Sequence, residues 1–237
     1  PDSVDIAVQS CLYSGGSGVN EDEENNVIVD CESRVWDLRK VNMEDPKIVP
    51  FWDKMMEHGR ILTRERAPLE HLQDGDALIA FMDRQGIDHA CTTSFGHKKV
   101  MGEAYDPVGV VIEAQQKYPK RVTGYVSINP LVSTWKDEFK FALDNGIRAI
   151  SIYPPEGYYA DGPECYEVYE HCLKNGVKTI FVHVGLLSMR ALELKYAHPL
   201  TLDNPARDFP DLNFVAEHFA YPWENDLIAV AWKQPNV

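Results

Sequence analysis

The sequence predicts an α/β fold in which parallel strands alternate with helices, and three observations support this class. Apolar strand-like runs and helical patterns alternate along the chain from residue 27 onward. Three predicted helices end in a glycine directly before a β-branched residue, at Gly86-Ile87, Gly146-Ile147 and Gly176-Val177. The strand-like runs show no regular polar alternation, which suits parallel strands that are covered on both faces.

The alternation defines six predicted strands and six predicted helical segments. The strands are expected at residues 27–31, 88–93, 122–128, 147–152, 178–184 and 212–216. The helices are expected at residues 74–85, 106–117, 135–144, 163–174, 205–209 and 223–232, the fifth of them a short turn.

Local signals justify these elements in chain order. The first helix places Ala77, Leu78, Phe81 and Met82 on one face. Several of the later helices and strands are followed by a proline or an Asn-Gly pair, residues that end regular structure, as at Asn145-Gly146 after the third helix. This pattern does not separate a doubly wound sheet from a barrel. No GxGxxG follows a strand, so a dinucleotide-binding fold has no support.

Composition excludes several classes of function. The net charge of −14 makes binding to nucleic acid or an anionic membrane unfavourable. No apolar run reaches the roughly 18 residues of a membrane span, and the start shows no secretory signal. Five widely spaced cysteines without a CxxC pair predict reduced thiols in a cytoplasmic protein. Residues 1–26 are polar and glycine-bearing and are expected to form an irregular arm.

The candidate site lies where the strands end, because active sites of parallel β/α proteins gather there. His183 and His218 end the fifth and sixth strands, and imidazole serves both as a metal ligand and as a proton carrier. Glu32 is a candidate ligand after the first strand, unless it only pairs with Arg34 or Arg39.

The other candidates have simpler alternatives. Glu217 is either a group at the rim of the site or a surface charge. The remaining histidines are expected to be structural: His58, His71, His89, His171 and His198. A GxSxG elbow, a P-loop and an HExxH motif are all absent.

Four segments resemble the amidohydrolase-related family, which includes aminocarboxymuconate-semialdehyde, γ-resorcylate and 5-carboxyvanillate decarboxylases. They are Gly124–Pro130, Gly146–Pro154, Phe181–Gly185 and Pro205–Leu212, the last followed by Glu217-His218. The resemblance implies that residues 27–237 form a (β/α)₈ TIM-like barrel with one divalent metal, zinc or manganese. It implies that His183 is a metal ligand, that His218 moves protons at the substrate, and that the protein is a homo-oligomer, either a dimer or a tetramer.

The sequence departs from the family pattern at three places. Glu32 and Arg34 stand where many members carry HxH; a permanently charged guanidinium cannot ligate a metal, but it can hold a substrate carboxylate. Ser151 replaces a lysine that bridges two metals in binuclear relatives, which favours a single metal. The chain stops before the last two barrel units and their expected aspartate ligand, so the barrel is expected to be incomplete.

Two functions follow. The first is a metal-dependent enzyme acting on a small aromatic or muconate-type carboxylic acid, with Glu32 and His183 as metal ligands, His218 as catalytic acid or base, and Arg34 as the substrate anchor. Decarboxylation is preferred slightly over hydrolysis. The second is a metal-free pseudoenzyme or ligand-binding subunit on the same barrel.

Overall fold

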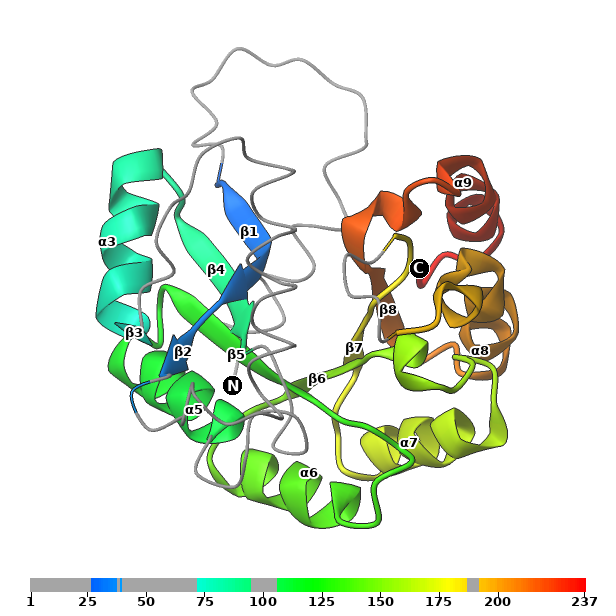
Figure 1. The fold of residues 1–237 in the computed structure, drawn as a ribbon, viewed down its shortest axis with the longest axis horizontal. Coiled ribbons are helices and arrows are strands. Elements are labelled where there is room, and N and C mark those ends of the chain that lie inside the picture. The colour runs from blue at the N-terminus through cyan, green and yellow to red at the C-terminus, as the bar shows by residue number, and fades with distance from the viewer. Residues whose placement is uncertain (1–26, 38, 40–71, 95–105, 187–191) are drawn as a thin grey trace.

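The computed structural model describes residues 27–37, 39, 72–94, 106–186 and 192–237, which form one curved parallel sheet with helices outside it (Figure 1). Within these residues the sheet has six strands in the order β1-β4-β5-β6-β7-β8. The strands are β1 (Val29–Arg34), β4 (His89–Thr93), β5 (Val122–Ser127), β6 (Ala149–Ile152), β7 (Thr179–Val182) and β8 (Asn213–Ala216). A small antiparallel pair lies apart from the sheet, made by β2 (Trp36–Asp37) and β3 (Leu72–Gln73).

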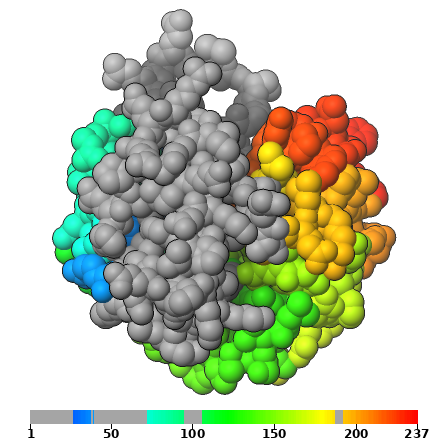
Figure 2. Space-filling view, viewed as in Figure 1, coloured from blue at the N-terminus to red at the C-terminus, as the bar shows by residue number. Residues whose placement is uncertain are grey.

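Helices connect successive strands, with one more helix after the last strand, and they lie around the outer face of the sheet (Figure 1). They are α3 (Gly75–Gln85), α5 (Pro107–Lys117), α6 (Trp135–Asp144), α7 (Pro163–Lys174), α8 (Asp203–Asp208) and α9 (Glu224–Lys233). Short 3₁₀ turns complete the loops: η1 (Pro154–Glu156), η2 (Leu194–Ala197), η3 (Pro199–Leu202) and η4 (Glu217–Ala220). In the space-filling view, α3 and α9 lie on opposite sides of the molecule (Figure 2).

The strand order decides between the two α/β architectures. Each strand pairs in parallel with the next strand of the main sheet along the chain, without any reversal of direction across the sheet. A doubly wound sheet reverses its order at a switch point, whereas a (β/α)₈ barrel adds every unit on the same side. The described residues therefore form a curled part of a barrel, and β1 and β8 are the outer strands of this sheet.

Two apolar clusters hold the sheet. The inner face carries a small cluster of Cys91, Tyr125, Ala149 and Phe181, in which the rings of Tyr125 and Phe181 stack with centroids 4.1 Å apart. The larger cluster lies between the outer face and the helices. Gly75 helps to bring two of these helices together, since a Cβ there would lie 3.1 Å from the Cα of Ala114 in α5.

The structure corrects the predicted boundary of the first strand. β1 runs to Arg34 and does not stop at Cys31, because its pairing with β4 resumes after an irregularity, with Ser33 opposite Thr92 and Arg34 opposite Thr93. The prediction ended the strand where its apolar run ended. The β2–β3 pair was also missed, since two residues per strand are too short for a periodic signal.

Other predicted elements agree with the structure to within a few residues. The helices at 135–144 and 163–174 have the predicted bounds. β6 and β7 are shorter than predicted, so that His183 follows its strand. Cys91, Cys165 and Cys172 are buried free thiols, whereas Cys31 is half-buried. Within the described ranges no helix is both long and apolar enough to cross a membrane. The predicted arm, residues 1–26, and His58 and His71 lie outside these ranges.

Candidate active site

A closed circuit of polar contacts lies at the carboxyl end of the sheet, and we call it the polar ring. Its members are Glu32, Arg34, Tyr125, His183, Glu217 and His218. They come from β1, from β5, and from the loops that follow β7 and β8. All four residues predicted for the site therefore come together, and two further residues join them.

The contribution of β1 is an ion pair. Arg34 donates from Nη2 to Oε1 of Glu32 at 2.6 Å, and each side chain is about one quarter exposed. Glu32 and Arg34 are two residues apart in a strand, so both point to the same face. The ion pair with Arg34, the alternative to a ligand role for Glu32, is therefore present. The second carboxylate oxygen of Glu32, Oε2, lies 3.3 Å from Nδ1 of His218, so Glu32 also contacts the histidine side of the site.

Tyr125 joins the β1 side of the ring to the β8 side. Its hydroxyl accepts a hydrogen bond from Nη1 of Arg34 at 3.1 Å and donates to Oε1 of Glu217 at 3.4 Å. The aromatic ring is fully buried and stacks on Phe181, so the position of the hydroxyl is fixed by packing. Sequence reasoning did not select Tyr125, because a tyrosine within an apolar strand is indistinguishable from a core residue.

His183 and Glu217 are buried in the polar ring. Glu217 is only 6% exposed, which shows that its alternative as a surface charge is wrong. Its Oε2 lies 3.5 Å from Nδ1 of His183. Val215, two residues earlier in β8, packs against the inner apolar cluster, so Glu217 continues the inward-facing side of that strand.

His218 reaches the site through an unusual turn. His218, Phe219 and Ala220 have φ values of 59°, 51° and 51°, a left-handed conformation that non-glycine residues rarely adopt. In a regular strand Glu217 and His218 would face opposite sides, but in this turn both contact His183. The Nε2 of His218 lies 3.0 Å from Nδ1 of His183.

Gly185 allows this turn to pack against the segment after β7. Its φ is +93°, and a Cβ on it would lie 2.8 Å from the carbonyl carbon of Ala220 and from the oxygen of Tyr221. The next residue, Leu186, donates its backbone N–H to the same oxygen of Tyr221 at 2.6 Å. The close approach of the two backbones thus sets how near His183 and His218 come to each other.

Burial and mutual charge change the acidity of the ring members. Burial, together with the negative charge of Glu217, raises the pKa of Glu32 to about 7, although Arg34 opposes this shift. Burial and the neighbouring His183 lower the pKa of His218 to about 4. Burial also lowers the pKa of His183 and raises the pKa of Tyr125 well above its usual range. At neutral pH both imidazoles are therefore neutral, the form in which histidine binds metals.

The histidine side of the polar ring fits a metal ion. The ligand atoms of His183, Glu217 and His218 lie within 4.8 Å of one another, at separations of 3.0, 3.5 and 3.9 Å. Ligand atoms about 2.1 Å from a tetrahedral zinc are separated by about 3.4 Å, so one ion would fit this triangle. The Nε2 of His183 is buried and finds no hydrogen-bond partner among the described residues.

Predicted structural histidines lie away from the polar ring. His89 contacts the carbonyl oxygen of Lys120 and the hydroxyl of Thr123. His171 packs on Trp135 and Phe139, with ring centroids 5.2 and 4.8 Å away.

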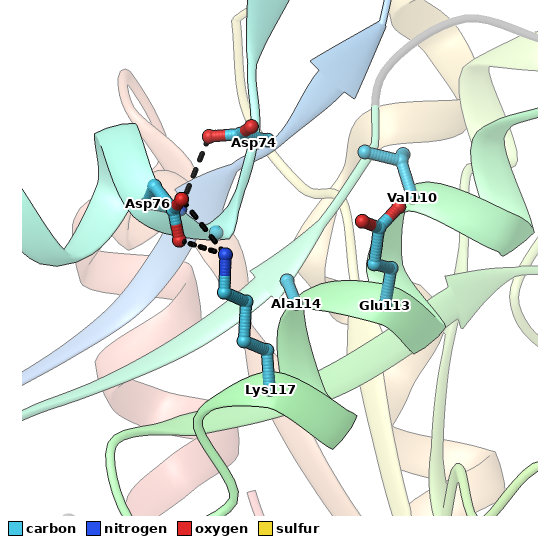
Figure 3. Close-up of a pocket in the computed structure, with 7 residues that line it drawn as sticks. Asp74, Asp76, Val110, Glu113, Ala114 and Lys117 are labelled. Carbon is cyan, nitrogen blue, oxygen red and sulfur yellow. Dashed lines mark hydrogen bonds and ion pairs between the residues drawn. The ribbon is translucent and has the colours of Figure 1, made fainter.

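A separate hollow lies between α3 and α5 (Figure 3). Its lysine, Lys117, forms an ion pair with Asp76 at 2.6 Å. Asp74 is the N-cap of α3 and accepts hydrogen bonds from two of its backbone N–H groups. These interactions account for Asp74, Asp76 and Lys117 as supports of the two helices.

Comparison with solved structures identifies TIM-barrel proteins. An uncharacterised TIM-barrel protein from Bordetella bronchiseptica has a TM-score of 0.67 and 22% identity, over 88% of this chain and 73% of its own. A manganese-bound 5-carboxyvanillate decarboxylase from Novosphingobium aromaticivorans has a TM-score of 0.59 and 17% identity, over 89% and 71%. A probable 2-pyrone-4,6-dicarboxylic acid hydrolase from Acinetobacter baumannii, with citric acid bound, has a TM-score of 0.54 and 12% identity, over 86% of this chain and 66% of its own.

These likenesses agree with the barrel architecture, and the chain spans 66–73% of the length of the three structures. No curated protein matches the sequence. The sequence profile of the family described as amidohydrolase matches residues 29–237, which is most of the chain and includes every member of the polar ring. The chain belongs to the amidohydrolase family.

Proposed function

We propose that the protein is a metal-dependent enzyme that acts on a small carboxylic acid, with decarboxylation preferred over hydrolysis. The observation that carries the proposal is the polar ring itself, in which a triangle of metal-ligand atoms adjoins an arginine at the carboxyl end of a barrel sheet. A decarboxylase and a hydrolase are among the proteins of similar fold, and the decarboxylase binds manganese.

We assign the metal to His183 and Glu217, the two buried members of the triangle. A divalent cation held there would polarise a substrate oxygen. Arg34 anchors a substrate carboxylate, because its guanidinium is held in place by Tyr125 and is partly exposed. Glu32 supports His218, since its Oε2 lies beside Nδ1 and leaves Nε2 directed at the centre of the site.

His218 moves the proton. Its lowered pKa keeps the imidazole neutral at neutral pH, and with the Nδ1 proton directed at Glu32 the Nε2 acts first as a base. On a hydroxy acid, Nε2 takes the hydroxyl proton and returns it to the carbon that bears the carboxylate. Protonation turns the oxygen into a neutral carbonyl. The bond to the carboxylate then breaks, CO₂ leaves, and the electron pair of that bond re-forms the carbon–carbon double bond while the carbonyl electrons move to the oxygen, which takes up the negative charge. On a lactone or amide the same nitrogen takes a proton from water.

The sequence-based assignment is the competing version of this proposal. There Glu32 and His183 hold the metal, whereas the triangle favours Glu217 over Glu32 as the carboxylate ligand. Metal content measured on full-length protein purified without chelator separates the two. In our assignment Glu217→Gln loses the metal and Glu32→Gln keeps it, whereas the competing one predicts the reverse.

Two histidine variants complete the test. His183→Ala loses the metal, whereas the matched control His198→Ala, outside the polar ring, keeps it. His218→Asn keeps the metal and loses activity if His218 is a proton carrier, but loses both if it is a third ligand. Wild type with about one zinc or manganese per chain is then screened for CO₂ release from aromatic and muconate-type acids.

The second candidate function is a metal-free ligand-binding protein on the same fold. Arg34 favours it, because its guanidinium already neutralises one carboxylate of the polar ring. This candidate predicts that wild type binds no zinc or manganese, even after either metal is added back, while carboxylate ligands still bind.

A further inference from the structure

The metal half and the carboxylate half of the polar ring share one buried connector. His183 and Glu217 form the first half, and Arg34 forms the second. The direct contact between the halves is the hydroxyl of Tyr125, which accepts from Arg34 at 3.1 Å and donates to Glu217 at 3.4 Å. The other route between them runs through Glu32 and His218.

We propose that Tyr125 is a positioning residue that couples metal binding to substrate binding. The inference rests on the proposed function and adds to it that the affinity of each ligand depends on the other through this one hydroxyl.

The contacts give the coupling its physical basis. A carboxylate at Glu217 has two oxygens, of which Oε2 faces His183 and Oε1 faces Tyr125. Binding a cation at Oε2 fixes the orientation of the carboxylate, and hence the acceptor that Tyr125 uses. The hydroxyl oxygen of Tyr125 then continues to accept the hydrogen bond from Nη1 of Arg34, and the guanidinium stays in a single orientation, with Nη2 on Glu32. A carboxylate that binds Arg34 stabilises the same arrangement from the other end, because linkage is reciprocal.

Packing makes the connector rigid. Tyr125 is fully buried and its aromatic ring is parallel to that of Phe181 to within 11°. The hydroxyl cannot follow a displaced partner without disturbing this stack. A change at Glu217 is therefore transmitted to Arg34 and is not absorbed by the tyrosine.

The test measures the metal affinity of the full-length protein with and without a carboxylate, at about pH 8, where histidine is neutral. Zinc is titrated calorimetrically, in separate series with no acid, with benzoate and with cis,cis-muconate. Wild type is expected to bind zinc about tenfold more tightly with at least one of the acids, within the usual range of coupling. In Tyr125→Phe this ratio falls to within about twofold of one, while both ligands still bind when they are measured alone.

A matched control separates coupling from a general loss of stability. Tyr169 is also a fully buried tyrosine, and its hydroxyl donates to the carbonyl of Ala160 at 2.7 Å, away from the polar ring. Tyr169→Phe removes a comparable hydrogen bond and is expected to keep the wild-type ratio.

The outcomes distinguish this inference from the proposed function. A tenfold ratio that persists in Tyr125→Phe overturns the connector alone and assigns the coupling to charge or to the route through Glu32. Zinc binding in wild type that does not respond to either acid also overturns the connector, but leaves the metal site intact. Wild type that binds no zinc overturns both.

Discussion

Replacing Gly185 by alanine tests whether the close approach of two backbones sets the geometry of the site. At φ +93° a Cβ costs about 1–2 kcal/mol by itself. The Cβ would also lie 2.8 Å from the carbonyl carbon of Ala220, a backbone atom that cannot rotate away as a side chain would. Overpacking of this kind costs about 1–3 kcal/mol. We therefore expect Gly185→Ala to lower the free energy of unfolding by about 2–5 kcal/mol.

The matched control is Gly86→Ala at the end of α3. Gly86 has a comparable φ of +70°, but a Cβ on it would meet no atom within 4 Å. Only the backbone cost of about 1–2 kcal/mol remains. For a chain of this size 1 kcal/mol corresponds to about 2–4 °C, so thermal unfolding followed by circular dichroism resolves the difference. Equal destabilisation in the two variants would refute the argument from backbone contact.

The same substitution also has a local effect. Relief of the contact moves the turn of residues 218–221 away from Gly185, which separates His218 from His183. When metal affinity is measured at a temperature at which both variants are folded, it should therefore be lower in Gly185→Ala than in wild type. Gly86→Ala should keep the wild-type affinity. This measurement distinguishes damage at the site from damage to the fold.

Three further predictions address the scaffold and the site. The side chain of Gln115 accepts a hydrogen bond from the N–H of Gly124 and donates one to the carbonyl of Gly146. Gln115→Ala should therefore lower the free energy of unfolding in urea by about 1–3 kcal/mol. Gln115→Glu keeps an acceptor for Gly124, so it should cost less if that contact dominates. Burial lowers the pKa of His89 from 6.5 in the folded state, so on acidification the unfolded chain takes up the proton first. The contribution of neutral His89 to the free energy of unfolding is therefore complete above pH 6.5 and is lost as the pH falls through the lowered pKa. The stability of His89→Gln should lack this acid-side loss, and an unchanged pH profile would contradict the assignment. Added zinc at 100 times its dissociation constant should stabilise the fold by about 2.7 kcal/mol, and chelation should reverse the effect in the same melting assay.

Much of the scaffold was predictable because local signals agree with tertiary structure. Gly86, Gly146 and Gly176 all have positive φ, as expected where a helix ends and a strand begins. The barrel order of the strands was not in these signals. It follows from pairings between segments far apart in the chain, and the family resemblance alone indicated it.

The site was predictable where residues project from strand ends and not where tertiary contacts define the role. His183, His218, Glu32 and Arg34 were found in this way. Tyr125 was missed because its hydroxyl gains meaning only from Arg34 and Glu217, which are 91 and 92 residues away along the chain. In a regular strand the side chains of Glu217 and His218 would face opposite sides, so only one of them would be predicted to face the site. The left-handed turn that brings both into the site contains no glycine, so the sequence gives no sign of it.

The separation of the ring members along the chain has a consequence for biosynthesis. His183 is made 35 residues before His218, and Glu32, in β1, is made long before either of them. Domains fold during or soon after their synthesis, beginning at the N-terminal end. The strands β1 to β7 can therefore pair before the last ring member has left the ribosome. A metal bound as we propose would be captured late and could not guide the earlier steps, so the nascent barrel depends on its apolar layers until the turn after β8 closes the circuit.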